Sequence, residues 1–306
     1  MEYLHYISQN TRDFLTQQYP DRTPEWTSAF SGEVERLIEK WKLSLNCHEL
    51  NSRFGAILYG TSDIYGEVAI KIVPWFCSRL ETEVYCYRHL PYREMCTLYD
   101  VDMSMGALLL KYVPPRADAD RAAMEGVFSS LYAQRLRFDG GACALPRYED
   151  VLSQVLATAE SAVKRSDDAR LHPFLPCVAR AAETMRAFDG EDRYVIHGDA
   201  HEYNLLSSGD TCVLIDPLGY VAPFCFEYAR YLGTAMKETA LSDGDLASLL
   251  GRVLPRGESA QRALDAFAVD VTLRACNTFI EGNTYEEICA GGDWARRAWA
   301  YRDTLI

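Results

Sequence analysis

The sequence predicts an α+β protein with a small antiparallel-sheet N-terminal lobe and a mostly helical C-terminal lobe. Alternating and β-branched segments gather between residues 54 and 113, and long amphipathic segments dominate after the Pro-Pro pair at 114–115. One short β-rich stretch, at 194–216, interrupts those helical segments. We therefore expect an N-lobe of residues 1–113 and a C-lobe of residues 114–306, without a flexible linker between them.

The N-lobe begins with a helical region over 2–42, because apolar residues at 34, 37, 38 and 41 recur on one helix face. A second helix is predicted over 79–90, where Pro91 stops it. Strands are predicted at 54–59, 67–73, 96–102 and 106–113. These four segments are expected to belong to a five-stranded sheet with a helix packed on it.

The C-lobe is predicted to consist mainly of long amphipathic helices, at 118–135, 148–165, 174–188, 243–253 and 258–281. A shorter helix follows the β-rich stretch, near 223–232. No internal repeat or low-complexity tract interrupts this order.

Composition and charge narrow the function before any motif is considered. Of the 306 residues, 48% are hydrophobic and 25% are charged, which is typical of a globular protein. The 31 basic and 44 acidic residues give a net charge of −13, which disfavours a nucleic-acid or anionic-membrane partner. The C-lobe has 20 basic and 29 acidic residues, and this excess is compatible with a cationic small-molecule substrate.

The sequence also predicts a cytoplasmic location. The ten cysteines form no Cys-x-x-Cys pair and most have apolar neighbours, so we expect buried free thiols. The N-terminus lacks the basic and apolar regions of a secretory signal. No run of 18 apolar residues occurs, so no membrane span is expected.

The chemistry-bearing residues lie in and after the β-rich stretch. Residues 197–204 read His-Gly-Asp-Ala-His-Glu-Tyr-Asn, and residues 215–217 read Ile-Asp-Pro. In phosphoryl transfer one Asp accepts or orients the proton of the attacking hydroxyl, while an Asn and a second Asp hold magnesium. Mg²⁺ needs only a few hard oxygen ligands besides water and phosphate. Asp199, Asn204 and Asp216 fit these roles.

These motifs resemble those of the aminoglycoside phosphotransferase and choline kinase family, which has the protein-kinase-like fold. The similarity is greatest to its streptomycin 6-kinase and hydroxyurea phosphotransferase branch. It rests on His-Gly-Asp-x-His-x-x-Asn, Ile-Asp-Pro-x-Gly, Gly-Ala-Leu-Leu-Leu and Glu-Lys-Trp-Lys-Leu, at 197–204, 215–219, 106–110 and 39–43. The resemblance covers roughly residues 30–235.

The resemblance implies an ATP- and Mg²⁺-dependent kinase with a bilobal fold, and GTP is also compatible with it. Asp199 would be the catalytic base, and His197 would brace the catalytic loop. Asn204 and Asp216 would bind magnesium. Glu227 stands where relatives carry an acidic residue, usually Asp, that supports this loop; a structural pair of Glu227 with Arg230 is an equal alternative.

The resemblance also implies a nucleotide site on the N-lobe. Lys71, in the Val-Ala-Ile-Lys segment, would bind the α- and β-phosphates. Its ion-pair partner would be Glu83, with Glu81 as the competitor. Ser52 lies in the segment expected to cover the phosphates. The adenine would bind to backbone groups of Leu110, Lys111 and Tyr112.

The implied activity is transfer of the γ-phosphate to a hydroxyl of a small molecule. An aminoglycoside of the streptomycin type, or hydroxyurea, would make the protein an antibiotic-resistance kinase; a sugar, amino sugar or choline-like alcohol would make it a metabolic kinase. Pro217 replaces the Phe of Asp-Phe-Gly and no Ala-Pro-Glu segment follows, so no protein substrate is expected. The resemblance implies no particular oligomeric state.

Other interpretations of the same residues remain open. An inactive nucleotide-binding regulator and a non-enzymatic helical scaffold are alternatives to an enzyme. His197 and His201 could form a zinc pair, although Gly198 disfavours the helix that this spacing needs. Acceptor contacts are expected from the C-lobe, with five candidates: Glu202, Tyr203, Glu281, Asn283 and Trp294.

Overall fold

The chain divides into two compact units. The structure is a computed structural model, and it describes residues 3–46, 54–77, 79–114, 121–141, 143–166, 171–208, 211–239, 243–281 and 285–305. Unit 1 comprises Met1–Arg88 and Met95–Pro115, and unit 2 comprises His89–Glu94 and Arg116–Ile306. The division falls two residues after the lobe boundary expected at 113, and a short segment from the N-lobe belongs to unit 2.

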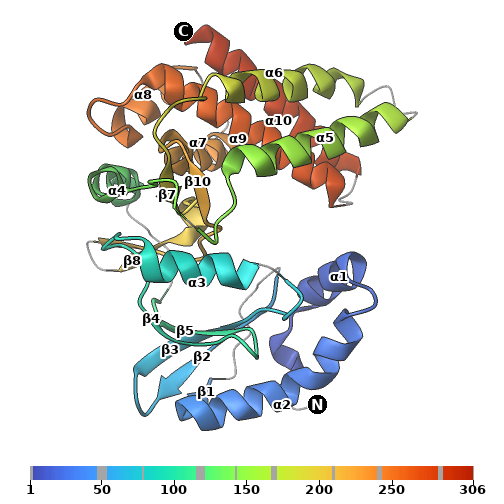
Figure 1. Ribbon diagram of the computed structural model, residues 1–306, viewed down its shortest axis with the longest axis vertical. Helices are drawn as coiled ribbons and strands as arrows, with labels where there is room; N and C mark the ends of the chain where they lie inside the picture. The colour runs from blue at the N-terminus through green and yellow to red at the C-terminus, as the bar shows by residue number, and fades with distance from the viewer. Residues whose placement is uncertain are drawn as a thin grey trace. The chain divides into compact units, whose positions relative to one another are not determined.

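Unit 1 contains the expected five-stranded antiparallel sheet, and its strand order is β1-β2-β3-β5-β4 (Figure 1). Its strands are β1 (Leu43–Leu45), β2 (Ala56–Ser62), β3 (Gly66–Ile72), β4 (Leu98–Asp102) and β5 (Ala107–Lys111). Its helices are α1 (Gln9–Gln18), α2 (Thr23–Trp41) and α3 (Arg79–His89). The expected helical region over 2–42 is therefore two main helices.

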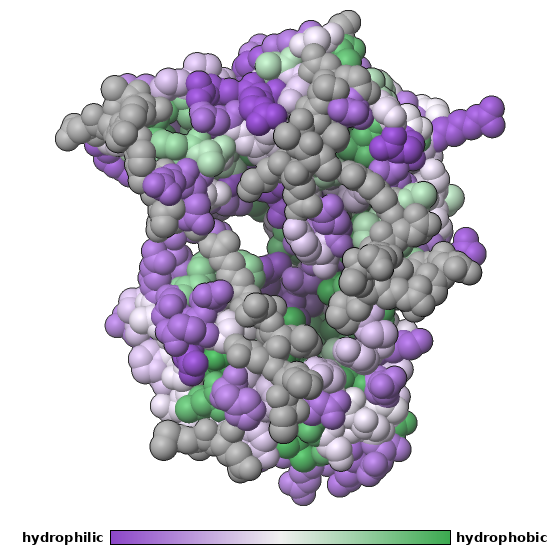
Figure 2. All heavy atoms as spheres, turned by 180° about the vertical axis from the view of Figure 1, so that it is seen from behind, coloured by the Kyte–Doolittle hydropathy of each residue, from purple (hydrophilic) through white to green (hydrophobic). Residues whose placement is uncertain are grey.

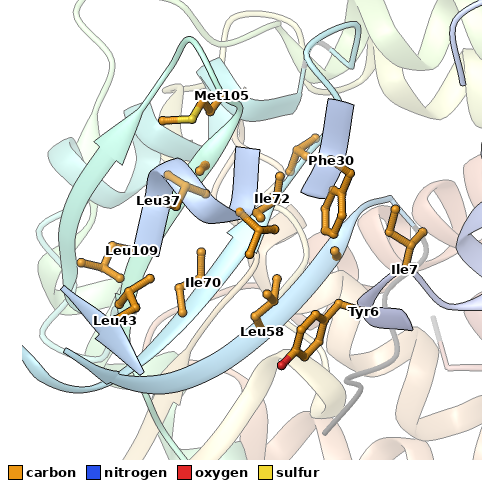
Figure 3. Packing of buried hydrophobic residues seen from close by; sticks show 14 of the residues in the cluster. Tyr6, Ile7, Phe30, Leu37, Leu43, Leu58, Ile70, Ile72, Met105 and Leu109 are labelled. Carbon is orange, nitrogen blue, oxygen red and sulfur yellow. The ribbon is translucent and has the colours of Figure 1, made fainter. Parts of the chain in front are cut away.

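The core of unit 1 lies between α2 and one face of the sheet. Figure 3 shows Phe30 and Leu37 of α2 beside buried sheet residues, among them Leu58, Ile70, Ile72 and Leu109. Successive side chains of a strand point to opposite faces. Lys71, between Ile70 and Ile72 on β3, therefore points to the face away from α2. In the register of the sheet it stands between Ile57 of β2 and Leu108 of β5.

Unit 2 is mostly helical. Its helices are α4 (Arg121–Gln134), α5 (Tyr148–Arg165), α6 (Leu175–Arg186), α7 (Cys225–Thr239), α8 (Asp243–Val253), α9 (Ala260–Ile280) and α10 (Tyr285–Thr304). Helix α9 is buried along most of its length and packs against α5, α6, α7 and α10 (Figure 1). Helix α10 is not among the predicted helices, because its Gly291-Gly292 pair is unfavourable in an isolated helix. Packing on α9 offsets this cost.

Two small sheets position the segments of unit 2 that carry the predicted catalytic residues. One consists of β10 (Tyr220–Ala222), β7 (Tyr194–Ile196) and β6 (Leu136–Arg137), in that order. The other is the hairpin of β8 (Leu205–Ser208) and β9 (Thr211–Leu214). Residues 197–204 connect β7 to β8, and residues 215–219 connect β9 to β10. Both segments therefore connect the three-stranded sheet to the hairpin.

The surface and the cysteines agree with the expectations from composition. On the face drawn in Figure 2, hydrophilic residues predominate and apolar ones form small separate patches. Every cysteine in the described part of the chain is a free thiol, and most are buried. Among the described helices, none is both long and apolar enough to cross a bilayer.

Candidate active site

A left-handed glycine shapes the predicted catalytic loop, residues 197–204, which follows β7. Gly198 has φ of 75°, a conformation that L side chains rarely adopt. A Cβ at this position would also lie 2.5 Å from the ring of Tyr220. Only glycine therefore fits between His197 and Asp199, and the turn directs both side chains into the interior of unit 2, where they are buried.

His197 braces the loop as a neutral imidazole. Its Nδ1 accepts a hydrogen bond from the backbone N–H of Asp199 at 3.2 Å, so Nε2 carries the proton and donates to the carbonyl of Ile215 at 3.0 Å. Burial lowers the pKa of His197 to about 4, despite the nearby carboxylates. Because both ring nitrogens are engaged, His197 has none left for a zinc pair with His201.

Further hydrogen bonds join the catalytic loop to the segment of Asp216. The N–H of Ile215 donates to the carbonyl of Asn204 at 3.0 Å, and the N–H of Gly219 donates to the carbonyl of His197 at 3.0 Å. Asp216 itself adopts a left-handed conformation with φ of 58°. Such strain in a residue other than glycine is typical of functional sites. The structure thus brings together the segments that carry Asp199, Asn204 and Asp216.

The Asp199 carboxylate is held through both of its oxygens. Its Oδ1 accepts from Nε of Arg230 at 2.6 Å, and its Oδ2 accepts from Nδ2 of Asn204 at 3.2 Å. Burial alone would raise the pKa of Asp199, but the positive charge of Arg230 and the hydrogen bond from His201 outweigh it. The pKa therefore lies below its usual range, and Asp199 is ionised at neutral pH.

The donor set beside Asp199 fits a magnesium ion. Nδ2 of Asn204 donates to both the carbonyl and the carboxylate of Asp199, which leaves its amide oxygen as the atom available to a cation. One amide oxygen and the carboxylate of Asp216 are hard ligands of the kind that Mg²⁺ binds together with water and phosphate. Among the described residues, no group of three or more His, Cys, Asp or Glu side chains could hold a metal ion.

Glu227 supports the catalytic loop from α7. Its side chain is completely buried, and Oε2 accepts a hydrogen bond from the backbone N–H of His197 at 2.6 Å. The Glu227 side chain is thus long enough to reach this loop. Arg230, one helical turn further on, does not form the alternative structural pair with Glu227, since its ion-pair partners are Asp199 and Asp270.

Glu227 is expected to make stability depend on pH. Burial raises its pKa from 4.5 to about 8, so the folded protein keeps a proton that the unfolded chain releases near pH 4.5. The free energy of unfolding therefore loses on the order of 3 kcal/mol as pH rises from about 5 to 8. Glu227→Gln removes this contribution. Denaturant unfolding of the wild type and of Glu227→Gln at several pH values checks this prediction. If the free energies of unfolding of the two proteins changed equally with pH, the prediction would be wrong.

In unit 1, Lys71 is paired with Glu83. Its Nζ lies 2.9 and 2.8 Å from the two carboxylate oxygens of Glu83 on α3. The two side chains are 11% and 2% exposed, so both charges are largely removed from water. Glu81, two residues earlier on α3, is exposed to solvent. The structure thus joins Lys71 to the first of the two partners considered from sequence.

Some of the backbone groups expected to bind adenine form hydrogen bonds within the protein. The N–H of Lys111 donates to the carbonyl of Thr97 at 2.9 Å, and the N–H of Tyr112 donates to the carbonyl of Glu67 at 3.2 Å. Leu110 lies within the sheet, opposite Ala69. Ser52 and Asn283 lie outside the described residues.

Solved structures resemble this chain, although no protein-family model matches its sequence and no curated protein does. Aminoglycoside phosphotransferase APH(4)-Ia has a TM-score of 0.63 at 13% identity, over 89% of this chain and 99% of its own. Choline kinase LicA from Streptococcus pneumoniae has a TM-score of 0.62 at 12% identity, over 88% of this chain and 97% of its own. A choline/ethanolamine kinase family protein from Mesorhizobium loti has a TM-score of 0.62 at 14% identity, over 89% of this chain and 94% of its own.

Ligands are present in further structures of two of these proteins. A thermostable mutant of the phosphotransferase was solved with ADP and hygromycin B, and LicA was solved with AMP. At these levels of identity the similarity concerns the fold, which matches the antiparallel sheet of unit 1 and the helices of unit 2. The chain therefore has the α+β, protein-kinase-like fold that aminoglycoside phosphotransferases and choline kinases share.

Proposed function

We propose that this protein is an ATP- and Mg²⁺-dependent small-molecule kinase that transfers the γ-phosphate to a hydroxyl group. One observation carries the proposal: the catalytic loop holds an ionised Asp199 against Asn204 and is hydrogen-bonded to the segment of Asp216. The buried Lys71–Glu83 pair of unit 1 is the second element that phosphoryl transfer in this fold uses. The structural neighbours, which include proteins solved with ADP and AMP, support a nucleotide as the donor.

Asp199 would accept a hydrogen bond from the acceptor hydroxyl and orient its oxygen toward the phosphate. Its carboxylate is ionised because of Arg230, so it can orient the hydroxyl and accept its proton as the phosphoryl group is transferred. Asn204 and Asp216 would hold magnesium, which supplies positive charge to the phosphates when bound. Lys71, fixed by Glu83, would hold phosphate oxygens, and backbone groups of residues 110–112 would bind the adenine.

For the acceptor we propose an amine-bearing alcohol, with an aminoglycoside first. The structural neighbours include aminoglycoside phosphotransferases, choline kinases and choline/ethanolamine kinases, whose acceptors combine amino or ammonium groups with hydroxyls. The net negative charge of residues 114–306 favours such cations. An aminoglycoside acceptor would make the protein an antibiotic-resistance kinase, and a choline-like acceptor a metabolic one.

A screen for acceptor-dependent release of nucleoside diphosphate tests this proposal. The purified protein is given ATP or GTP with Mg²⁺ and one of several acceptors: aminoglycosides including streptomycin, amino sugars, neutral sugars, choline and hydroxyurea. We expect release with at least one amine-bearing alcohol and little with neutral sugars. Release with neutral sugars alone would overturn the acceptor class, whereas no acceptor-dependent release at all would overturn the kinase.

A further inference from the structure

Arg230 lies in a row of buried charges that leads from the catalytic loop into the helices of unit 2. From α7 its Nε donates to Oδ1 of Asp199 at 2.6 Å, and its Nη1 lies 3.8 Å from Oδ2 of Asp270 on α9. The side chains of Arg230, Asp199 and Asp270 are 19%, 11% and 7% exposed. One guanidinium therefore bridges a loop carboxylate and a helix carboxylate, both largely shielded from water.

Asp270 is held from two other sides. The hydroxyl of Tyr148 on α5 donates to its Oδ1 at 3.2 Å, and Nε of Arg274, one turn further along α9, lies 3.0 Å from its Oδ2. Gly233 on α7 makes room for this arrangement, because a Cβ there would collide with the guanidinium of Arg274. Helices α5, α7 and α9 thus all contribute to fixing Asp270, the anchor of Arg230.

The carboxylate of Asp199 needs such a fixed partner. The χ2 torsion of an Asp side chain has a broad range, so the loop backbone alone does not set the plane of the carboxylate. Arg230 holds Oδ1 and Asn204 holds Oδ2, and together they define that plane. Phosphoryl transfer depends on the orientation of the attacking oxygen, and an error of about 1 Å costs about 10²-fold in rate.

Stability alone is a weak reason for this buried pair. A buried ion pair is often no more stabilising than apolar residues of similar volume, because both charges lose their hydration. Helices α7 and α9 pack against each other, and both carry buried residues without charge, such as Leu232 and Val271.

We propose that Arg230 is a positioning residue that acts through Asp199, and that Asp270, with Tyr148 and Arg274, holds Arg230 in place. Arg230 fixes the Asp199 carboxylate in the orientation that receives the acceptor hydroxyl. The consequence for turnover rests on the proposed kinase activity, whereas the consequence for the conformation of Asp199 does not. The two can therefore be tested separately.

The test compares Arg230→Met with Arg302→Met. Arg302 is a matched control, because its Nε also donates to a buried carboxylate of α9, Asp265 at 2.8 Å, and it has no contact with Asp199. Crystal structures of both variants and of the wild-type protein are compared. We expect the Asp199 carboxylate to be displaced in Arg230→Met and unchanged in Arg302→Met. An unchanged Asp199 in Arg230→Met would overturn the proposal.

Kinetics with the acceptor found in the screen give the second arm. For Arg230→Met we expect kcat to fall about 100-fold with little change in KM for ATP. Arg230→Lys should retain more activity, because lysine reaches Asp199 but lacks the second set of donors for Asp270. Asp270→Asn, which leaves the Arg230–Asp199 contact in place, should cause a smaller loss. If Arg302→Met lowered kcat equally, the effect of Arg230 would be structural and the positioning role would be wrong.

The two arms separate this inference from the kinase proposal. A displaced Asp199 in a protein that phosphorylates none of the acceptors would support the positioning by Arg230 and refute the kinase. Normal turnover in Arg230→Met would refute the positioning and leave the kinase intact. If Arg230→Met does not fold, Arg230→Lys and Asp270→Asn carry the same comparison.

Discussion

Asp199→Asn is expected to lower kcat by about 10³-fold, in the range that a positioned proton acceptor contributes to catalysis. The amide has the shape of the carboxylate but no charge, so it orients the acceptor hydroxyl poorly and leaves Arg230 with one carboxylate fewer. Nucleotide binding should survive, because Lys71, Asn204 and Asp216 are unchanged. Steady-state release of nucleoside diphosphate measures kcat, and the thermal shift with ADP measures binding.

The control is Asp189→Asn, which makes the same chemical change at an exposed aspartate of unit 2. It should leave kcat unchanged. A saturating nucleotide at 100 times its Kd should stabilise wild type and Asp199→Asn alike, by about 2.7 kcal/mol. Full turnover by Asp199→Asn would exclude this residue from the reaction, and loss of the nucleotide shift would mean that Asp199 acts in binding instead.

Glu83→Gln is expected to lower the free energy of unfolding by about 3 kcal/mol. The substitution removes the carboxylate that lies 2.8 Å from the ammonium group of Lys71, which is only 11% exposed. A buried charge that loses its opposite charge retains the cost of desolvation without the compensating attraction. Denaturant unfolding followed by tryptophan fluorescence suits this test, because Trp26 and Trp41 lie in the core of unit 1.

Two further variants make the interpretation specific. Glu81→Gln changes an exposed carboxylate on the same helix, and its effect should stay within about 0.5 kcal/mol. Lys71→Met in the Glu83→Gln background removes the ammonium group that has lost the Glu83 carboxylate, and it should recover part of the lost stability. If Glu81→Gln were the more destabilising of the two glutamate variants, the assignment of the lysine partner would be wrong.

The fold could be predicted where the sequence has a clear period. The alternation in Val68, Ile70 and Ile72 identifies β3 and places Lys71 on the other face, and α5 and α8 begin and end at the expected residues. Strand β1 has three residues, too few for an alternation to be visible. Helix α10 contains two adjacent glycines and forms through its contacts with α9, which the sequence does not encode locally.

The candidate site, like the fold, could be predicted from the sequence only in part. Asp199 and Asn204 lie five residues apart in one loop, and their spacing carries a recognisable motif. Arg230 is 31 residues from Asp199 in sequence, and no local pattern predicts their contact. Its spacing from Glu227 suggested a helical pair, but the helix directs Glu227 to the backbone of His197 and Arg230 to two carboxylates. Asp270 reaches this site only because α9 packs on α7.

The transfer of a labelled phosphoryl group tests the central claim most directly. The protein is incubated with the acceptor that gives the strongest nucleotide release and with ATP radiolabelled in either the γ- or the α-phosphate. We predict that the γ-label appears in the acceptor, that the α-label does not, and that Asp199→Asn suppresses the labelled product. Transfer of the α-label, or release of nucleoside diphosphate without any labelled acceptor, would contradict a small-molecule kinase.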